Sequence, residues 1–330
     1  MEQGTVRLRV CWDGEGGRIV AAGVDCRRPQ AASLLVGRAP AEALALVPRL
    51  FSLCARAQAA AAQLAAAAAA GRLPAVDAGT TLAVAREAIG EHLWRLLLDW
   101  PALLGEAPAK AALLDWRKRL LTASSPADND ALGAALLDWL PSLAAIAAAE
   151  PAPAAVTALL PWQPASAWAA LPIDAAFAAA PTWAGRPAET GALARRHAAP
   201  PVAALLAAGQ RVAARHAARL ADLDFLARGL RDPALLRDWL DAAPAGDGVG
   251  LARVETARGL LLHLMQVKDE RVARYVIVAP TEWNFHPQGA FAGELAGAPA
   301  ASREQAALIA RRLALALDPC VNYEVVVADA

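Results

Sequence analysis

The chain has 330 residues, which is long enough for one large domain or two closely packed ones. Its 32 lysine and arginine residues are balanced by 32 acidic residues, so the sequence offers no basic excess for binding nucleic acid. Four scattered cysteines in a chain of this length do not make a disulfide scaffold. We therefore expect a protein of the reducing cytoplasm, where its thiols stay available for metal.

The N-terminal segment and the most apolar run argue against a secretory signal and a membrane span. The first residues, Met-Glu-Gln-Gly-Thr, do not form a basic region followed by an apolar stretch. Residues 57–70 are almost all alanine and include two glutamines. This run is too short and too weakly apolar to cross a bilayer.

Residues 1–36 form the first segment of the predicted fold. Apolar and polar residues alternate at 5–11, and a second strand-like run follows at 18–25. The turn between them is rich in aspartate and glycine, which is typical of a β-hairpin.

A helix is predicted to begin near Pro40 and to run through Cys54 into the alanine-rich stretch. Glu42 lies in its first turn, where a carboxylate is favourable. Apolar residues recur at helical spacing up to Cys54, which places this thiol on the buried face. Pro48 lies inside the pattern and predicts a break or kink just before Arg49.

The helical body is expected to span residues 37–250. Within it, residues 150–201 are rich in proline but also contain tryptophans, which favours short helices joined by turns over disorder. A helical stretch at 81–121 is expected to break at Pro101. Further helical stretches are predicted at 127–148, 202–230 and 233–241.

Residues 251–330 combine strands with a final helix that ends before Cys320. The whole chain is therefore predicted to be an α+β protein, predominantly helical, with short peripheral β-hairpins near both ends. The elements expected in this last segment are strands at 260–267 and 271–278, a loop at 280–284, a helix at 302–317 capped by Ser302, and a short strand at 321–327.

Each cysteine, taken alone, is interpreted as a small buried hydrophobe. That interpretation is kept for Cys11, on a predicted strand, and for Cys26, between two charged residues. Cys54 and Cys320 differ in their surroundings. Cys320 follows Asp-Pro at a helix-to-strand junction, which leaves its thiol on a fixed turn.

The sequence around Cys54 and Cys320 resembles the large subunit of nickel–iron hydrogenases. That family has the motifs Arg-x-Cys-Gly-x-Cys-x-x-x-His and Asp-Pro-Cys-x-x-Cys-x-x-His. Here the first reads Arg-Leu-Phe-Ser-Leu-Cys-Ala-Arg-Ala-Gln at 49–58, and the second reads Asp-Pro-Cys-Val-Asn-Tyr-Glu-Val-Val at 318–326.

The resemblance extends to three further segments in the family's order. Gly-Arg-Ala-Pro at 37–40 resembles a Gly-Arg-x-Pro segment, and Val-Glu-Thr-Ala-Arg-Gly at 254–259 resembles a Glu-Ala-Pro-Arg-Gly loop. Val-Ala-Pro-Thr-Glu-Trp-Asn at 278–284 follows at the family's spacing. Residues 60–240 resemble the family only weakly. The resemblance implies a truncated large-subunit fold over residues 1–330 as a single domain.

The departures from the family pattern concern nickel. In the family four cysteines hold nickel, and the second cysteine of each pair also bridges to iron. Phe51 and Tyr323 stand at two of these four positions, and neither offers the soft thiolate donor that such a nickel site needs. The motif histidines are replaced by Gln58 and Val326. We therefore expect no nickel and no hydrogen turnover.

What remains is one thiolate from each motif, Cys54 and Cys320. The family's iron carries two cyanides and one carbon monoxide, and its Arg-Gly arginine and Pro-Thr/Ser hydroxyl serve the cyanides. The matching positions here are Arg258 and Thr281. The resemblance thus implies two thiolates for an Fe(CN)2(CO) unit, although Cys320 matches a family cysteine that binds nickel only.

The combination of kept and missing residues resembles the hydrogenase accessory proteins of the HupK/HoxV family, as does the run at 91–101. This resemblance implies a non-catalytic scaffold that binds the iron unit transiently and delivers it to the hydrogenase large subunit. The expected partners are the large-subunit precursor and the chaperones that assemble the iron cofactor.

Five further residues are candidates near the site, and three of them have two possible roles. Glu255 is either in a structural ion pair near Arg258 or a hydrogen-bond relay at the site, and Glu42 is either a helix-start carboxylate or a polar group near the metal. Pro280 is interpreted as aiming the backbone of Thr281. Asp318 either ends the helix and fixes the Cys320 turn or bonds to a metal ligand. His263 is interpreted as a satisfied polar core group.

Two other functions remain open from the residues. The chain is either a relict interaction protein without metal, such as a chaperone or decoy, or a redox enzyme subunit. The absence of two cysteines argues against the enzyme, and the presence of Arg258 and Thr281 argues against the metal-free protein.

Overall fold

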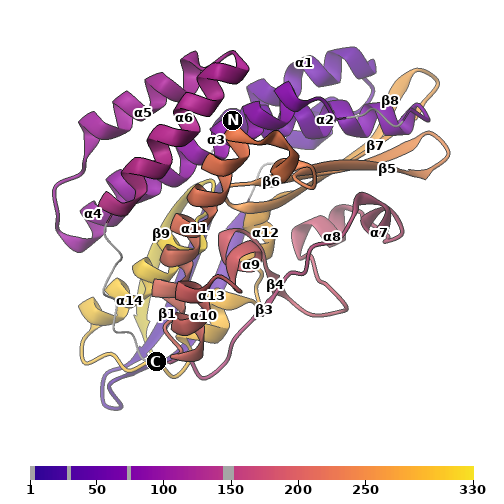
Figure 1. The fold of residues 1–330 in the computed structure, drawn as a ribbon. Coiled ribbons are helices and arrows are strands. Elements are labelled where there is room, and N and C mark those ends of the chain that lie inside the picture. The colour runs from indigo at the N-terminus through magenta and orange to yellow at the C-terminus, as the bar shows by residue number, and fades with distance from the viewer. Residues whose placement is uncertain (1–3, 28–30, 73–75, 144–151) are drawn as a thin grey trace.

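A three-stranded sheet joins segments from opposite ends of the chain. The computed structural model describes residues 4–27, 31–72, 76–143 and 152–330. Strands β1 (Thr5–Asp13) and β2 (Arg18–Arg27) form the predicted antiparallel hairpin, and β9 (Asn322–Asp329) pairs with β1 in parallel. The strand order is β2-β1-β9, so the strand that follows Cys320 is anchored on the first strand (Figure 1).

Cys54 lies on a turn between two helices rather than inside one helix. The sequence predicts a break or kink just before Arg49, but helix α1 (Pro40–Leu50) continues past Pro48, so a break there is wrong. A proline inside a helix removes one hydrogen bond and crowds the carbonyl four residues earlier, and α1 ends at Leu50, soon after it. The chain turns at Phe51 and forms a 3-10 turn (Ser52–Cys54) before α2 (Ala55–Ala69).

Helix α3 (Ala78–Trp94) continues through a π-helical turn (Arg95–Asp99) into α4 (Trp100–Leu104). The predicted break at Pro101 is therefore wrong. In the widened turn the N–H of Trp100 donates to the carbonyl of Arg95, so the helix changes its hydrogen-bond spacing just before the proline. The helix ends instead at Gly105, whose φ of 79° is left-handed.

The middle of the chain is helical, as predicted, with short helices in the proline-rich segment. Trp168 is fully buried there, whereas the side chain of Trp162 is 54% exposed. Parts of the predicted stretches at 127–148 and 150–201 lie outside the described residues. The helices of this region are α5 (Lys110–Thr122), α6 (Pro126–Trp139), α7 (Ala165–Ala169), α8 (Ala175–Ala179), α9 (Ala192–Arg196), α10 (Pro200–Ala207) and α11 (Arg211–Arg231).

A four-stranded antiparallel sheet, larger than predicted, follows α11. Its order is β5-β6-β7-β8, and residues 233–241, predicted as helix, form a 3-10 turn (Pro233–Leu236) and the start of β5. Strand β6 is buried at every position, so this sheet lies more centrally than the predicted peripheral hairpins. The strands are β5 (Leu240–Gly246), β6 (Val249–Thr256), β7 (Gly259–Lys268) and β8 (Arg271–Val278).

The alanine-rich helix α2 packs directly on this sheet (Figure 1). Its backbone approaches β6 so closely that a Cβ atom on Gly250 would lie 2.1 Å from the carbonyl oxygen of Ala65. Larger side chains on this face of α2 would push the helix away from the sheet. The long alanine run is therefore a packing feature that sets the distance between α2 and β6.

The last segment contains three helices and carries the predicted site residues Pro280, Thr281, Asp318 and Cys320. The expected loop at 280–284 is a single helical turn, α12 (Pro280–Asn284), and Pro280 occupies its first position, which proline favours. Helix α13 (Ala290–Leu295) precedes α14 (Arg303–Leu317), where Ser302 caps the N-terminus as predicted. Two minor strands, β3 (Ala158–Leu159) and β4 (Ala188–Glu189), pair in parallel. None of the helices within the described ranges is long and apolar enough to span a membrane.

Candidate metal-binding site

Cys54 and Cys320 lie near enough for their charges to interact, although their motifs lie at opposite ends of the chain. Cys54 immediately precedes α2, and Cys320 follows the end of α14. Both side chains are half-buried, and no disulfide links the cysteines in the described part of the chain. The charge of Cys320 acts on Cys54, and the charge of Arg258 acts on both thiols. The fold thus brings three of the predicted site residues together.

The environment of Cys54 favours the neutral thiol. Burial raises the pKa of Cys54 to about 12, and the nearby charges of Cys320 and Glu87 act in the same direction. The charge of Arg258 and a hydrogen bond from Gln58 oppose this shift without cancelling it. At neutral pH the thiol therefore keeps its proton until a cation replaces it.

Glu87 closes the N-terminus of α2 next to Cys54. Its carboxylate accepts hydrogen bonds from the backbone N–H groups of Arg56 at 2.8 Å and Ala57 at 2.9 Å. Burial nevertheless raises the pKa of Glu87 to about 7, because these two bonds only partly offset the desolvation. No local pattern of residues predicts this contact between α3 and α2.

A buried chain of hydrogen bonds links Cys54 through Gln58 and His263 to Tyr275. The Nε2 atom of Gln58 donates to the sulfur of Cys54 at 3.6 Å, and its Oε1 lies 2.9 Å from Nε2 of His263. The other ring nitrogen of His263 lies 2.8 Å from the hydroxyl of Tyr275. Burial lowers the pKa of His263 to about 3, so the ring is neutral. His263 is a satisfied polar core group, as predicted.

Thr281 holds Cys320 through two hydrogen bonds. Its hydroxyl donates to the sulfur of Cys320 at 3.1 Å and accepts from the backbone N–H of Cys320 at 3.2 Å. Pro280 fixes the start of the short helix that carries Thr281. The hydroxyl therefore lies within reach of any group that the sulfur binds.

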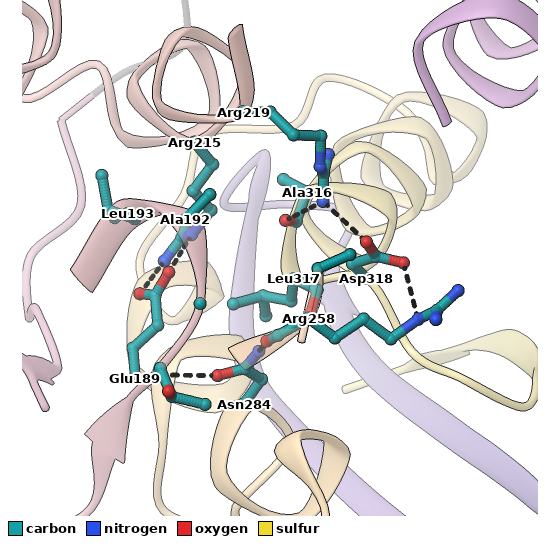
Figure 2. Close-up of a pocket in the computed structure, with 13 residues that line it drawn as sticks. Glu189, Ala192, Leu193, Arg215, Arg219, Arg258, Asn284, Ala316, Leu317 and Asp318 are labelled. Atoms are coloured by element: carbon teal, nitrogen blue, oxygen red, sulfur yellow. Dashed lines mark hydrogen bonds and ion pairs between the residues drawn. The ribbon is translucent and has the colours of Figure 1, made fainter. Parts of the chain in front are cut away.

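Asp318 ends α14 in a left-handed conformation, with φ of 59°, and interacts with three arginines, of which Figure 2 shows Arg219 and Arg258. Arg95 donates at 2.6 Å and Arg219 at 3.0 Å, and Nε of Arg258 lies at 3.2 Å. Burial alone would raise the pKa of Asp318, but the three guanidinium groups together hold it well below its usual range. A cavity of about 20 Å³, with room for a water, adjoins Arg219 and Arg258.

Two residues that sequence reasoning missed belong to this site. The guanidinium of Arg95 also donates to the carbonyl of Pro319 at 2.8 Å and pairs with Asp99. Glu91 accepts from Nη2 of Arg258 at 2.7 Å. Both residues lie in the run at 91–101, whose resemblance to the accessory proteins was the one available signal.

Glu255 and Glu42 form their hydrogen bonds and ion pairs with residues outside the candidate metal site. Glu255 accepts from Arg195 at 2.7 Å and pairs with Arg253, so the ion pair expected beside Arg258 is made with different arginines. Glu42 is exposed and accepts from the backbone N–H of Ala39 at 3.4 Å. It starts α1, and the length of that helix separates it from Cys54.

The two positions that match missing nickel ligands contribute to packing. Phe51 and Tyr323 are half-buried and pack against the main hydrophobic core. Among the residues that the structure describes, no three His, Cys, Asp or Glu side chains are grouped so that they could hold a metal ion. A metal at this site would therefore depend on two thiols and on ligands that it brings with it.

The fold defines a class of protein. The structure is similar to the Ni-Fe-Se hydrogenase of D. vulgaris Hildenborough in the reduced state, with a TM-score of 0.63, 16% sequence identity, and coverage of 92% of this chain and 94% of that chain. It is also similar to an NAD+-reducing [NiFe]-hydrogenase, with a TM-score of 0.59, 17% identity and 94% coverage of both chains. Residues 174–325 match the family model described as nickel-dependent hydrogenase. The chain has the fold of a nickel–iron hydrogenase large subunit, as predicted.

Similarity over nearly the whole chain identifies the family more narrowly. The chain is 34% identical to hydrogenase expression/formation protein HupK of Rhizobium leguminosarum bv. viciae, covering 93% of this chain and 92% of the relative. It is 31% identical to HoxV of Cupriavidus necator, covering 93% of both chains. The chain belongs to the HupK/HoxV family of hydrogenase expression/formation proteins, which confirms the resemblance. By contrast, the uptake hydrogenase large subunit of Rubrivivax gelatinosus is 35% identical over 89 residues, only 14% of its length.

Proposed function

We propose that this protein binds an Fe(CN)2(CO) unit through Cys54 and Cys320 and delivers it to the precursor of a hydrogenase large subunit. The names of its relatives support a role in hydrogenase assembly. The observation that carries the finer proposal is that the charges of Cys54, Cys320 and Arg258 interact while Thr281 bonds to the sulfur of Cys320.

The chemistry of the donor set fits this cargo. Two thiolates suffice for an iron that already carries diatomic ligands, and soft thiolates are suitable donors for it. Cyanide nitrogens accept hydrogen bonds, which Arg258 and Thr281 are able to donate. The guanidinium also supplies a permanent positive charge against an anionic complex. Thr281 already donates to the sulfur of Cys320, and the charge of Arg258 acts on both thiols.

The protonation of Cys54 suits a carrier that must release its cargo. A metal binds the thiolate, so binding has to displace a proton from a thiol whose pKa is about 12. Return of a proton to Cys54 opposes the iron–sulfur bond and favours release. A site with such a thiol has a lower affinity for iron than one built from thiols of low pKa.

In the proposed function the protein carries the iron unit and catalyses no reaction. Phe51 and Tyr323 offer no thiolate where the family's motifs have two cysteines, so nickel is not expected beside the iron. The protein partners in the proposal are the large-subunit precursor and the chaperones that make the iron unit. The transfer would take place in the reducing cytoplasm, where both thiols stay reduced.

Infrared spectroscopy of anaerobically purified protein from a hydrogenase-producing host tests the proposal. We expect cyanide and carbonyl bands together with bound iron, and we expect both to disappear in Cys54→Ala. The matched control is Cys11→Ala on β1, which should keep the bands. Iron-free protein without bands, from a host that matures hydrogenase normally, would overturn the proposal. A metal-free interaction protein would instead still bind the large-subunit precursor after both site cysteines are replaced.

A further inference from the structure

The carboxylates of Glu91 and Asp318 both interact with the guanidinium of Arg258. Glu91 accepts from Nη2 at 2.7 Å, and Asp318 lies 3.2 Å from Nε. The side chain of Arg258 is only 7% exposed, so both ion pairs act in a poorly solvated region. Two N–H groups of Arg258 that would bind an anionic cargo therefore already face carboxylates.

Asp318 cannot leave Arg258. Its side chain is 3% exposed, and Arg95 and Arg219 hold both of its oxygens. Removing it would leave three buried cations without their common partner, which is strongly unfavourable. Its contact with Arg258 is a fixed part of the site.

Glu91 is held far less firmly. It lies in the last full turn of α3, its side chain is 20% exposed, and its hydrogen bond within the described residues is the one to Arg258. A rotation of this side chain would bring the carboxylate into water and free Nη2 of Arg258. Glu91 is thus the member of the pair that is able to move.

The charge of the proposed cargo makes this difference matter. Ferrous iron with two cyanides and two thiolates has a formal charge of −2. Glu91 adds a further negative charge on the same arginine, so it repels the bound complex and competes with a cyanide for the same donor. Its effect on the iron unit is opposite to that of Arg258.

We infer that Glu91 is a release element: it competes with the iron unit for Arg258, so that the protein holds its cargo weakly enough to hand it on. The inference rests on the proposed function and adds to it a direction of transfer. A carboxylate that merely neutralised Arg258 for stability would strengthen the site, whereas a competing one weakens it. The two roles predict changes of opposite sign when the charge is removed.

The test is Glu91→Gln, which keeps the shape and a hydrogen-bond acceptor but removes the charge. We expect the infrared bands per protein to increase, and the loss of these bands after mixing with large-subunit precursor to slow on the order of tenfold. The matched control is Asp115→Asn on α5, which removes one negative charge from an exposed surface pair with Arg119 and should leave the transfer rate unchanged.

An increase cannot arise from partial unfolding, which would lower the amount of bound iron. Bands that are unchanged or weaker in Glu91→Gln, beside normal bands in the wild-type protein, would overturn the role of Glu91 alone. Absence of bands in both proteins would overturn the proposed function and this inference together. The pair of samples therefore separates the two failures.

Discussion

The side chains of Arg95 and Asp318 are joined at 2.6 Å although they lie 223 residues apart in the chain. Arg95 comes from the π-helical turn after α3, and it also donates to the carbonyl of Pro319 at 2.8 Å. A single guanidinium thus holds both residues that precede Cys320. The position of that thiol is set by a distant helix as well as by its own turn.

Replacing Arg95 with methionine should loosen the Cys320 turn. Asp318 keeps Arg219 and Arg258 as partners, so we expect a loss of about 2 kcal/mol in the free energy of unfolding rather than collapse of the fold. Iron affinity should fall about 10- to 100-fold, as is usual when a group that orients a metal ligand is lost. Urea unfolding and iron content measure the two effects.

The control for this variant is Arg119→Met. Arg119 is an exposed arginine paired with Asp115 one turn away, and such surface pairs contribute about 0–1 kcal/mol. Equal losses of stability in the two variants would show that the contact of Arg95 with Asp318 has no special weight.

Gly250→Ala should be strongly destabilising because α2 lies against the backbone of β6. A Cβ atom at this position would be 2.1 Å from the carbonyl oxygen of Ala65 and 2.3 Å from the backbone nitrogen of Ala69. We expect a loss of about 3 kcal/mol or more in the free energy of unfolding, since the backbone must shift. Gly23→Ala, in β2, meets nothing within 4 Å and should change stability by less than about 0.5 kcal/mol.

Gln58→Leu should destabilise the protein by about 1–3 kcal/mol, because it leaves the ring N–H of His263 and the thiol of Cys54 without a partner. Gln63→Leu on the same helix is the matched control, since Gln63 is exposed. Chemical denaturation of both variants provides the comparison. If the two behave alike, the buried chain from Cys54 to His263 contributes nothing measurable.

The neutral state of His263 predicts a pH dependence of stability. Its pKa in the folded protein is about 3, below the ordinary value of 6.5, so the unfolded chain binds more protons between these values. The contribution is complete above pH 6.5 and is lost as the pH falls toward 3, with a slope of about 1.4 kcal/mol per pH unit. His263→Gln should flatten the acid side of the stability curve, whereas His197→Gln, at an exposed site, should not. A curve of unchanged slope in His263→Gln would rule out this origin.

The sequence predicted those parts of the molecule that leave a local pattern. The hairpin at 5–11 and 18–25 alternates because one face of the sheet is buried, and the cap at Ser302 is a local hydrogen bond. Strand β6 was missed because it is buried on both faces, which erases the alternation. The resemblance of residues 254–259 to a family loop also favoured a loop over the strand that ends at Thr256.

Only part of the site was predicted from the sequence. That part came from motifs that occur in the same order as in the family. Resemblance placed Thr281 near a thiol, and the structure shows its hydroxyl 3.1 Å from the sulfur of Cys320. The contacts of Glu91 and Arg95 were missed because they join distant segments, and no local pattern encodes such pairs. The break expected at Pro101 was wrong because a π-helical turn absorbs it.

The parallel pairing of β1 with β9 determines when, during folding, the region around Cys320 takes its final position. Thr5 of β1 pairs with Asn322 of β9, so a very long loop lies between the paired strands, and closing such a loop is entropically slow. Until β9 docks, the turn with Cys320 has no anchor on its C-terminal side. Before β9 pairs with β1, Cys320 is therefore not held in place near Cys54, and the proposed two-thiol site is completed late in folding.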